Sequence, residues 1–212
     1  MLQTSVLLVL GVGFLLGLKH ATDPDHIVAV TTFIGREKRI ARGCVIGLFW
    51  GLGHTLALSL IGLGVVVLKI PMSQWLAERL ELGVALMLVV LGARLIATVH
   101  TKWHEHHHDF EWTRLGLRPL LVGIVHGTAG SAALTLLVLS TISSTVDALL
   151  YILIFGVGSM VGMVLISLLL AIPMTLARDR LAGAIRPIQV GTGIFSCLFG
   201  VYLGASILMN LQ

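Results

Sequence analysis

The sequence predicts an all-α integral membrane protein with six transmembrane helices in a 3+3 inverted repeat, the first helix being broken. Three observations predict this class. The 212 residues are 57% hydrophobic and 11% charged, with a mean hydropathy of +1.00, which is too apolar for a surface in water. Six apolar segments are long enough to cross a bilayer, for which roughly 20 residues suffice. The two halves of the chain also resemble each other.

The predicted spans are 5–34, 43–68, 80–99, 119–141, 148–173 and 187–210. The connections after the first, third and fifth spans are rich in Lys and Arg: Arg36, Lys38, Arg39, Arg42, Lys102, Arg114, Arg118, Arg178, Arg180 and Arg186. The opposite connections hold only Lys69 and Arg79. The positive-inside rule therefore predicts a multi-pass protein of the cell (plasma or inner) membrane with both termini outside the cytoplasm. The net charge of +4 follows from this topology and indicates contact with membrane lipid rather than nucleic acid.

The first span carries a polar cluster, "HATDPDH". An ionised side chain at the bilayer centre costs about 2.5 to 3.5 kcal/mol on insertion scales, so Asp23 and Asp25 need a partner, water or a metal. On a straight helix, Asp25 would point about 140° away from His20, and His26 about 240° away from it. Pro24 lacks an N–H and crowds the preceding turn, which predicts a helix break. The break is expected to turn these side chains inward and to free backbone oxygens as ligands beside a cavity.

Histidines of three spans lie at similar predicted depths. They are His20, His26, His54 and His126. Counted at about 1.5 Å per residue from the basic connections, they lie roughly 12 to 24 Å into a hydrocarbon core about 30 Å thick. The predicted metal site consists of His20, Asp23, Asp25, His26, His54 and His126. For His54 or His126 taken alone, an interhelical hydrogen bond stays open as an alternative.

Imidazole with one or two carboxylates suits a divalent transition metal such as Ni²⁺ or Co²⁺. Mg²⁺ or Ca²⁺ favours oxygen alone and Cu⁺ favours sulfur, whereas Zn²⁺ stays open as an alternative. The metal is the expected cargo, and no cofactor is predicted. The sequence has no nucleotide-binding motif and no motif that predicts an enzyme.

The two halves of the chain match in corresponding spans. "GLKHATDP" in the first span resembles "GIVHGTAG" in the fourth, which aligns Gly17 with Gly123. "FWGLGHT" in the second resembles "IFGVGSM" in the fifth, which aligns Gly51 with Gly156, and the third and sixth spans each have two glycines nine residues apart. Repeats of three helices must be inverted, as in many secondary transporters. The predicted organisation is a first repeat over 1–99, a cytoplasmic His-rich loop over 100–117 and a second repeat over 118–212.

The loop "HTKWHEHHHDFEW" contains five histidines. It matches the His-Glu-x-x-His pattern of zinc proteases, but that pattern requires a structured helix beside a cavity, which a polar connector does not supply. The loop is expected to collect metal weakly at the cytoplasmic face. A solvated loop without a role in transport is the alternative.

Two motifs carry a family resemblance. "HATDPDHI" resembles the signature of the nickel/cobalt transporter (NiCoT/NicO) family, and "FWGLGHTLAL" resembles that family's second motif around Leu-Gly-His. The length and "VHGTAGSAAL" are most similar to its short urease-accessory (UreH-type) membrane proteins, although larger members have eight helices and acidic motifs in the second half. The resemblance implies that His20, Asp25 and His26 are metal ligands or essential to transport, and that His54 acts with them.

The sequence thus predicts a secondary transporter of Ni²⁺ or Co²⁺ that works in uptake. Moving a divalent cation inward gains about 4.6 kcal/mol per 100 mV of membrane potential, twice the value for one charge. Two alternatives stay open: an exporter of the same fold, and a membrane protein that hands metal to a urease or hydrogenase without transporting it. A cytoplasmic metallochaperone is a candidate protein partner.

Overall fold

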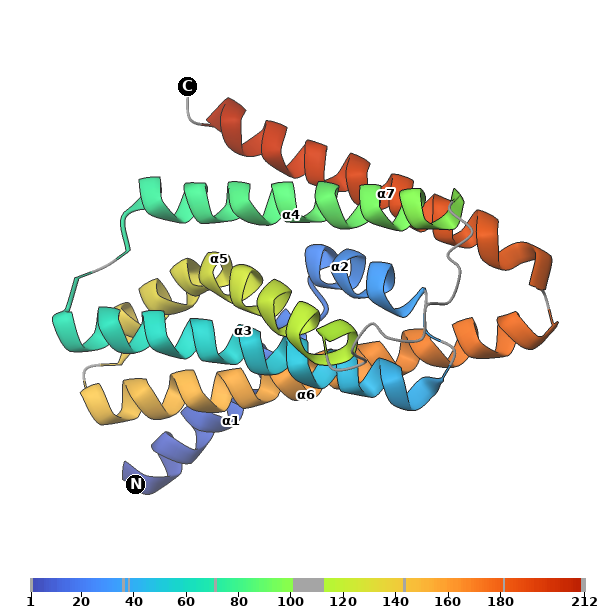
Figure 1. Cartoon of the computed structure of the whole chain (residues 1–212). Helices are drawn as coiled ribbons and strands as arrows, with labels where there is room; N and C mark the ends of the chain where they lie inside the picture. The colour runs from blue at the N-terminus through green and yellow to red at the C-terminus, as the bar shows by residue number, and fades with distance from the viewer. Residues whose placement is uncertain are drawn as a thin grey trace.

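The computed structural model describes residues 2–35, 37, 39–70, 72–100, 113–142, 144–180 and 182–210. Helices are the regular secondary structure of these residues, which include no strand, and this confirms the all-α part of the predicted class (Figure 1). The elements are α1 (Leu2–His20), α2 (Pro24–Ile34), α3 (Ile40–Leu68), α4 (Gln74–His100), the π-helical turn η1 (Thr113–Leu117), α5 (Arg118–Thr141), α6 (Thr145–Arg180) and α7 (Ala182–Asn210). The predicted break of the first span is confirmed, because α1 ends at His20 and α2 begins at Pro24, with three residues between them.

Helices extend into both ends of the predicted His-rich loop over 100–117. His100 still belongs to α4, and 113–117 form η1 directly before α5. These helical ends lie beyond the apolar segments. A helix satisfies its own backbone hydrogen bonds, so polar residues at a membrane surface can stay helical without being buried. The remaining part of the His-rich loop, 101–112, lies outside the described residues.

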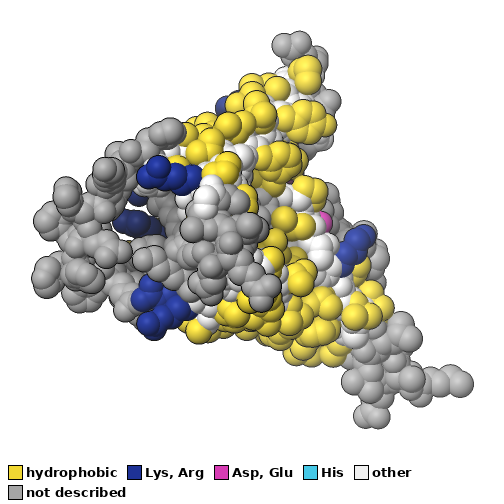
Figure 2. Space-filling view, turned by 90° about the vertical axis from the view of Figure 1, so that its right-hand side faces the viewer, with side chains coloured by type: hydrophobic (Ala, Val, Ile, Leu, Met, Phe, Trp, Pro, Cys, Tyr) yellow, Lys and Arg dark blue, Asp and Glu magenta, His cyan; other side chains and the backbone are white. Residues whose placement is uncertain are grey.

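The chain is a multi-pass membrane protein. Four helices are long and apolar enough to cross a bilayer: Ile40–Leu68 in α3, Gln74–Val99 in α4, Thr145–Leu176 in α6 and Ile185–Met209 in α7. Large apolar side chains point outward from these helices, and Leu60, Leu86 and Leu169 are 65% to 69% exposed. Hydrophobic side chains cover the flanks of the molecule in Figure 2. An apolar surface of this extent is suited to lipid.

Close backbone contacts hold the helices together. In Figure 1, α4 and α7 lie side by side, α1 packs on α6, and α5 packs on α3. A Cβ at Gly17 of α1 would collide with the Phe155 carbonyl of α6, and a Cβ at Gly123 of α5 would collide with the Trp50 carbonyl of α3. Only glycine permits such an approach, as is common between membrane helices.

The chain turns sharply between α1 and α2. Asp23 has an extended backbone (φ −60°, ψ 143°), the conformation that a following proline favours, and Pro24 occupies the first turn of α2. The Lys19 carbonyl accepts hydrogen bonds from the Thr22 backbone N–H (2.8 Å) and hydroxyl (2.6 Å). The His20 carbonyl accepts one from the Asp23 N–H (3.0 Å). The expectation of free backbone oxygens as ligands is therefore wrong at these two carbonyls, because the turn residues satisfy them.

The long helices form two groups, α4 with α7 and α3 with α5 and α6. The short helix α2 lies between these groups (Figure 1). Its buried residues are His26, Val28, Ala29, Val30, Thr32 and Ile34. The apolar ones pack in one cluster with Trp50 of α3, Leu88 of α4 and Met163 of α6. This burial holds the polar first turn of α2 inside the bundle, next to the end of α1.

Candidate metal centre

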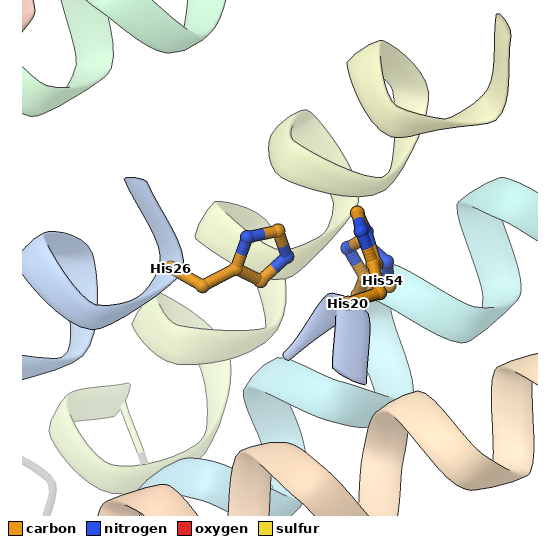
Figure 3. Close-up of side chains that lie close together, drawn as sticks. All are labelled: His20, His26 and His54. Carbon is orange, nitrogen blue, oxygen red and sulfur yellow. The ribbon is translucent and has the colours of Figure 1, made fainter. Parts of the chain in front are cut away.

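Four imidazoles meet at the break between α1 and α2. His20 is the last residue of α1, His26 lies in the first turn of α2, His54 lies within α3 and His126 within α5. The centroid of the His26 ring lies 4.0 Å from that of His126, 4.6 Å from that of His20 and 5.2 Å from that of His54. His54, His26 and His126 are 0%, 1% and 2% exposed. The structure thus brings the four predicted histidines together, three of which are drawn in Figure 3.

Two aspartates hold the imidazoles in place. Oδ1 of Asp25 accepts a hydrogen bond from Nδ1 of His26 (3.1 Å), and Oδ2 accepts one from Nε2 of His126 (2.8 Å). Oδ2 of Asp23 lies 2.8 Å from Nδ1 of His20. Because an ionised carboxylate only accepts hydrogen bonds, these ring nitrogens carry the protons. The opposite nitrogen of each ring then keeps a free lone pair, as a metal ligand requires.

These lone pairs have no partner among the described side chains. Among the residues that the structure describes, Nε2 of His20, Nε2 of His26, Nδ1 of His126 and both ring nitrogens of His54 are buried without a hydrogen bond. An unsatisfied buried polar group costs about 1 to 3 kcal/mol, so several in one place require an explanation. A bound cation would satisfy them.

The ligand atoms fall into two overlapping groups. One nitrogen each of His20, His26 and His54 lie within 4.8 Å of one another. An oxygen of Asp25 and nitrogens of His26 and His126 satisfy the same limit. A metal with bonds of about 2 Å holds its ligands roughly 3 Å apart, so the side chains of either group would have to move closer together to bind an ion.

A cavity of about 530 Å³, which we call the vestibule, reaches the cluster. Its lining includes Lys19, His20, Asp25, His26, Glu81 and His126. The sequence prediction missed Glu81, which projects from α4 at the start of the third predicted span. The signal that could have found it is an acidic residue inside a predicted span.

Small and aromatic residues shape the cluster, and the sequence prediction missed these as well. A Cβ at Gly130 of α5 would lie 3.2 Å from Nε2 of His20, so this glycine leaves room for the imidazole. The Phe155 ring centroid lies 5.5 Å from that of His20, and the Trp50 ring centroid lies 5.5 Å from that of His26. Their roles depend on contacts between helices, for which the sequence has no local signal.

Comparisons with known proteins show which family and relatives the chain resembles. Residues 6–114 match the NicO family, described as high-affinity nickel-transport protein. The chain is 38% identical over 211 residues to urease accessory protein UreH of Bacillus sp. (strain TB-90), covering 94% of this chain and 92% of that protein. It is 30% identical over 155 residues to a protein named as a nickel/cobalt efflux system in Methanocaldococcus jannaschii, covering 68% and 67%. No solved structure matches the chain.

Proposed function

The chain belongs to the NicO family of high-affinity nickel-transport proteins, and on that premise we propose that it is a secondary transporter of Ni²⁺ or Co²⁺. The family comprises membrane proteins of metal transport and urease accessory function, not enzymes. The observation that carries the proposal is the cluster of buried imidazole nitrogens without protein partners. Both metals bind imidazole well. The family and the matched efflux protein are named for nickel and cobalt, and neither supports the Zn²⁺ alternative.

In this proposal the histidines and aspartates have different roles. His20 and His26 bind the metal through the nitrogens that face away from the carboxylates, and His54 binds it through one of its two unpaired ring nitrogens. Asp23 and Asp25 accept hydrogen bonds from the other ring nitrogens and so orient the rings, as carboxylates commonly do behind metal-binding histidines. The second group, of Asp25, His26 and His126, supplies an adjacent position for the ion.

The proposal includes the 3+3 inverted repeat, and reciprocal contacts support it. The alignment that pairs Gly17 with Gly123 and Gly51 with Gly156 also pairs the neighbouring Trp50 with Phe155. Gly17 packs on the carbonyl of Phe155, and Gly123 packs on the carbonyl of Trp50. Each contact is therefore the image of the other under exchange of the two halves.

The same reciprocity occurs between α4 and α7. Gly92 packs on the carbonyl of Gly193, and Gly200 packs on the carbonyl of Ala85. The repeat alignment pairs Gly92 with Gly200 and, at the same offset, Ala85 with Gly193. The residue number falls along α7 as it rises along α4, so these equivalent helices are antiparallel. Antiparallel packing of equivalent helices is what an axis in the membrane plane produces.

The vestibule favours uptake over export. It is lined by Glu81 near the start of α4, Tyr151 near the start of α6 and Leu203 near the end of α7, so it lies toward the end of the bundle that holds both chain termini (Figure 1). The basic connections lie at the opposite end, and the positive-inside rule places that end in the cytoplasm. A metal ion then reaches the cluster from outside the cell. Export remains the competing direction because one relative is named an efflux system.

Transport by the purified full-length chain tests the proposal. Liposomes containing it are expected to take up Ni²⁺ or Co²⁺ in a saturable manner. His26→Ala is expected to abolish this flux, because His26 belongs to both ligand groups. Ser206→Ala in α7 is the control, since its hydroxyl donates to the Leu203 carbonyl of its own helix, and it is expected to keep the flux.

The outcomes separate the alternatives. A folded protein that binds Ni²⁺ but moves none would favour the hand-off function suggested by the urease accessory relative. Metal flux that persists in His26→Ala would contradict the assignment of the metal site to these ligand groups. Cells that lack the protein should require more nickel or cobalt in the medium, whereas greater sensitivity to the metal would indicate export.

A further inference from the structure

A second cavity lies on the other side of the histidine cluster. Its volume is about 280 Å³, and its lining includes Ile46 of α3, Arg94 of α4, and Arg118 and Val122 of α5. Along α3 it begins four residues before Trp50, and along α5 four residues before His126. This separation is about one helical turn, or 6 Å. The second cavity therefore lies between the cluster and the end of the bundle at which α3 and α5 begin.

Two residues that line the second cavity are the counterparts of two that line the vestibule. The repeat alignment pairs Leu16 with Val122 and Tyr151 with Ile46. Leu16 and Tyr151 line the vestibule, whereas Val122 and Ile46 line the second cavity. At these positions the second cavity is thus the counterpart of the vestibule at the opposite end of the bundle.

The two cavities differ in whether they reach the histidines. Phe155 lines the vestibule, which continues past it to His20 and His26. Trp50, its counterpart in the alignment, lines neither cavity, is 2% exposed, and has its ring centroid 5.5 Å from that of His26 and 5.9 Å from that of His126. The indole thus occupies the turn of α3 that separates the histidines from the second cavity.

From this arrangement we propose that the second cavity is the cytoplasmic half of the metal pathway and that Trp50 is the barrier that closes it from the cluster in this state. The inference rests on the proposed transport function and deepens it. The state described has its site open to the vestibule alone. Displacement of the Trp50 indole connects the histidine cluster to the second cavity. In transporters built from inverted repeats, such a change opens the site to the other side of the membrane.

The fixed charges differ along this route. Asp23, Asp25 and Glu81 outnumber Lys19 in the vestibule, so its field attracts a divalent cation. Arg94 and Arg118 outnumber Glu37 in the second cavity, and Arg42 lies 3.8 Å from the Glu37 carboxylate. An ion that has passed Trp50 is therefore not retained, and the second cavity serves release.

Accessibility of single cysteines tests the barrier. In the full-length chain with Cys44→Ala and Cys197→Ala, a cysteine is placed at Leu16 or at Val122. A small, membrane-impermeant cationic thiol reagent is applied to right-side-out or inverted membrane vesicles. With Trp50 intact, Leu16→Cys is expected to react only from the face of the chain termini and Val122→Cys only from the opposite face.

Removal of the indole should join the two cavities. Trp50→Ala is expected to make Val122→Cys reactive from the face of the termini, at a rate comparable to that of Leu16→Cys. Phe155→Ala is the matched control, because it removes the equivalent ring from a cavity that is already open, and it should leave that reaction absent. Trp50→Leu repeats the test if Trp50→Ala does not yield folded protein by size-exclusion chromatography.

Each result decides one proposal. Reactivity of Val122→Cys that is the same with and without Trp50, in protein that still transports Ni²⁺, would overturn the barrier while leaving transport intact. The expected labelling pattern in a protein that moves no metal would instead overturn the transport function.

Discussion

Asp25 joins two histidines, since its two oxygens accept hydrogen bonds from His26 and His126. In Asp25→Asn only one side-chain oxygen accepts, and the amide N–H faces a ring N–H. The Kd for Ni²⁺ is expected to rise about 10- to 100-fold, as for other losses of a carboxylate behind a metal-binding histidine. Titration calorimetry of the solubilised protein measures it. Asp147→Asn, in the first turn of α6, is the control, and equal affinity of both variants would contradict the orienting role.

Gly130 sets the space available to His20. In Gly130→Ala the new methyl group lies 3.2 Å from Nε2 and 3.4 Å from Cε1 of the imidazole, so the ring must shift. Weaker Ni²⁺ binding is expected with little change in Tm. Gly191→Ala, where a Cβ meets no atom within 4 Å, should keep the affinity and raise stability by up to about 1 kcal/mol. Equal affinities of the two variants would show that His20 does not need this space.

At the scale of the element, the break between α1 and α2 sets the directions of His20 and His26. Pro24→Ala restores an N–H and removes the ring that opposes a continuous helix, an effect of about 3 kcal/mol in a helix interior. On a continuous helix the two histidines point apart, so Ni²⁺ binding is expected to be lost while circular dichroism shows unchanged or higher helix content. Pro173→Ala, inside α6, tests whether removal of any proline has this effect. Retained binding in Pro24→Ala would mean that packing alone holds the break.

At the scale of the whole molecule, the distribution of basic residues among the connections predicts that both termini lie outside the cytoplasm. Figure 2 looks toward the end where α3 begins, and Lys and Arg side chains are visible there. Alkaline phosphatase fused to the C-terminus is therefore expected to be active, and a fluorescent protein fused there dark. A fluorescent protein fused after Glu105 should be bright. The reverse pattern would place the vestibule in the cytoplasm and reverse the proposed direction of transport.

Much of the fold and part of the candidate site were predictable from the sequence, because the signals are local. Apolar length predicted the helices, and Pro24 predicted the break at the correct residue. The cost of polar groups in lipid singled out the four histidines that the structure brings together. The expectation of free carbonyls was wrong at Lys19 and His20, because turns depend on backbone hydrogen bonds that composition does not specify.

The sequence by itself therefore determined the class of protein, the position of the break and the identity of the polar residues, since each follows from the transfer of one segment from water to lipid. Only the tertiary structure decided that Asp25 serves two histidines, that Glu81 lines the same cavity as the cluster, and that Phe155 lines the vestibule whereas Trp50 lines neither cavity. These relations depend on the rotation and depth of each helix against its neighbours. Glycine contacts between helices far apart in the chain set that rotation, and no single segment encodes it.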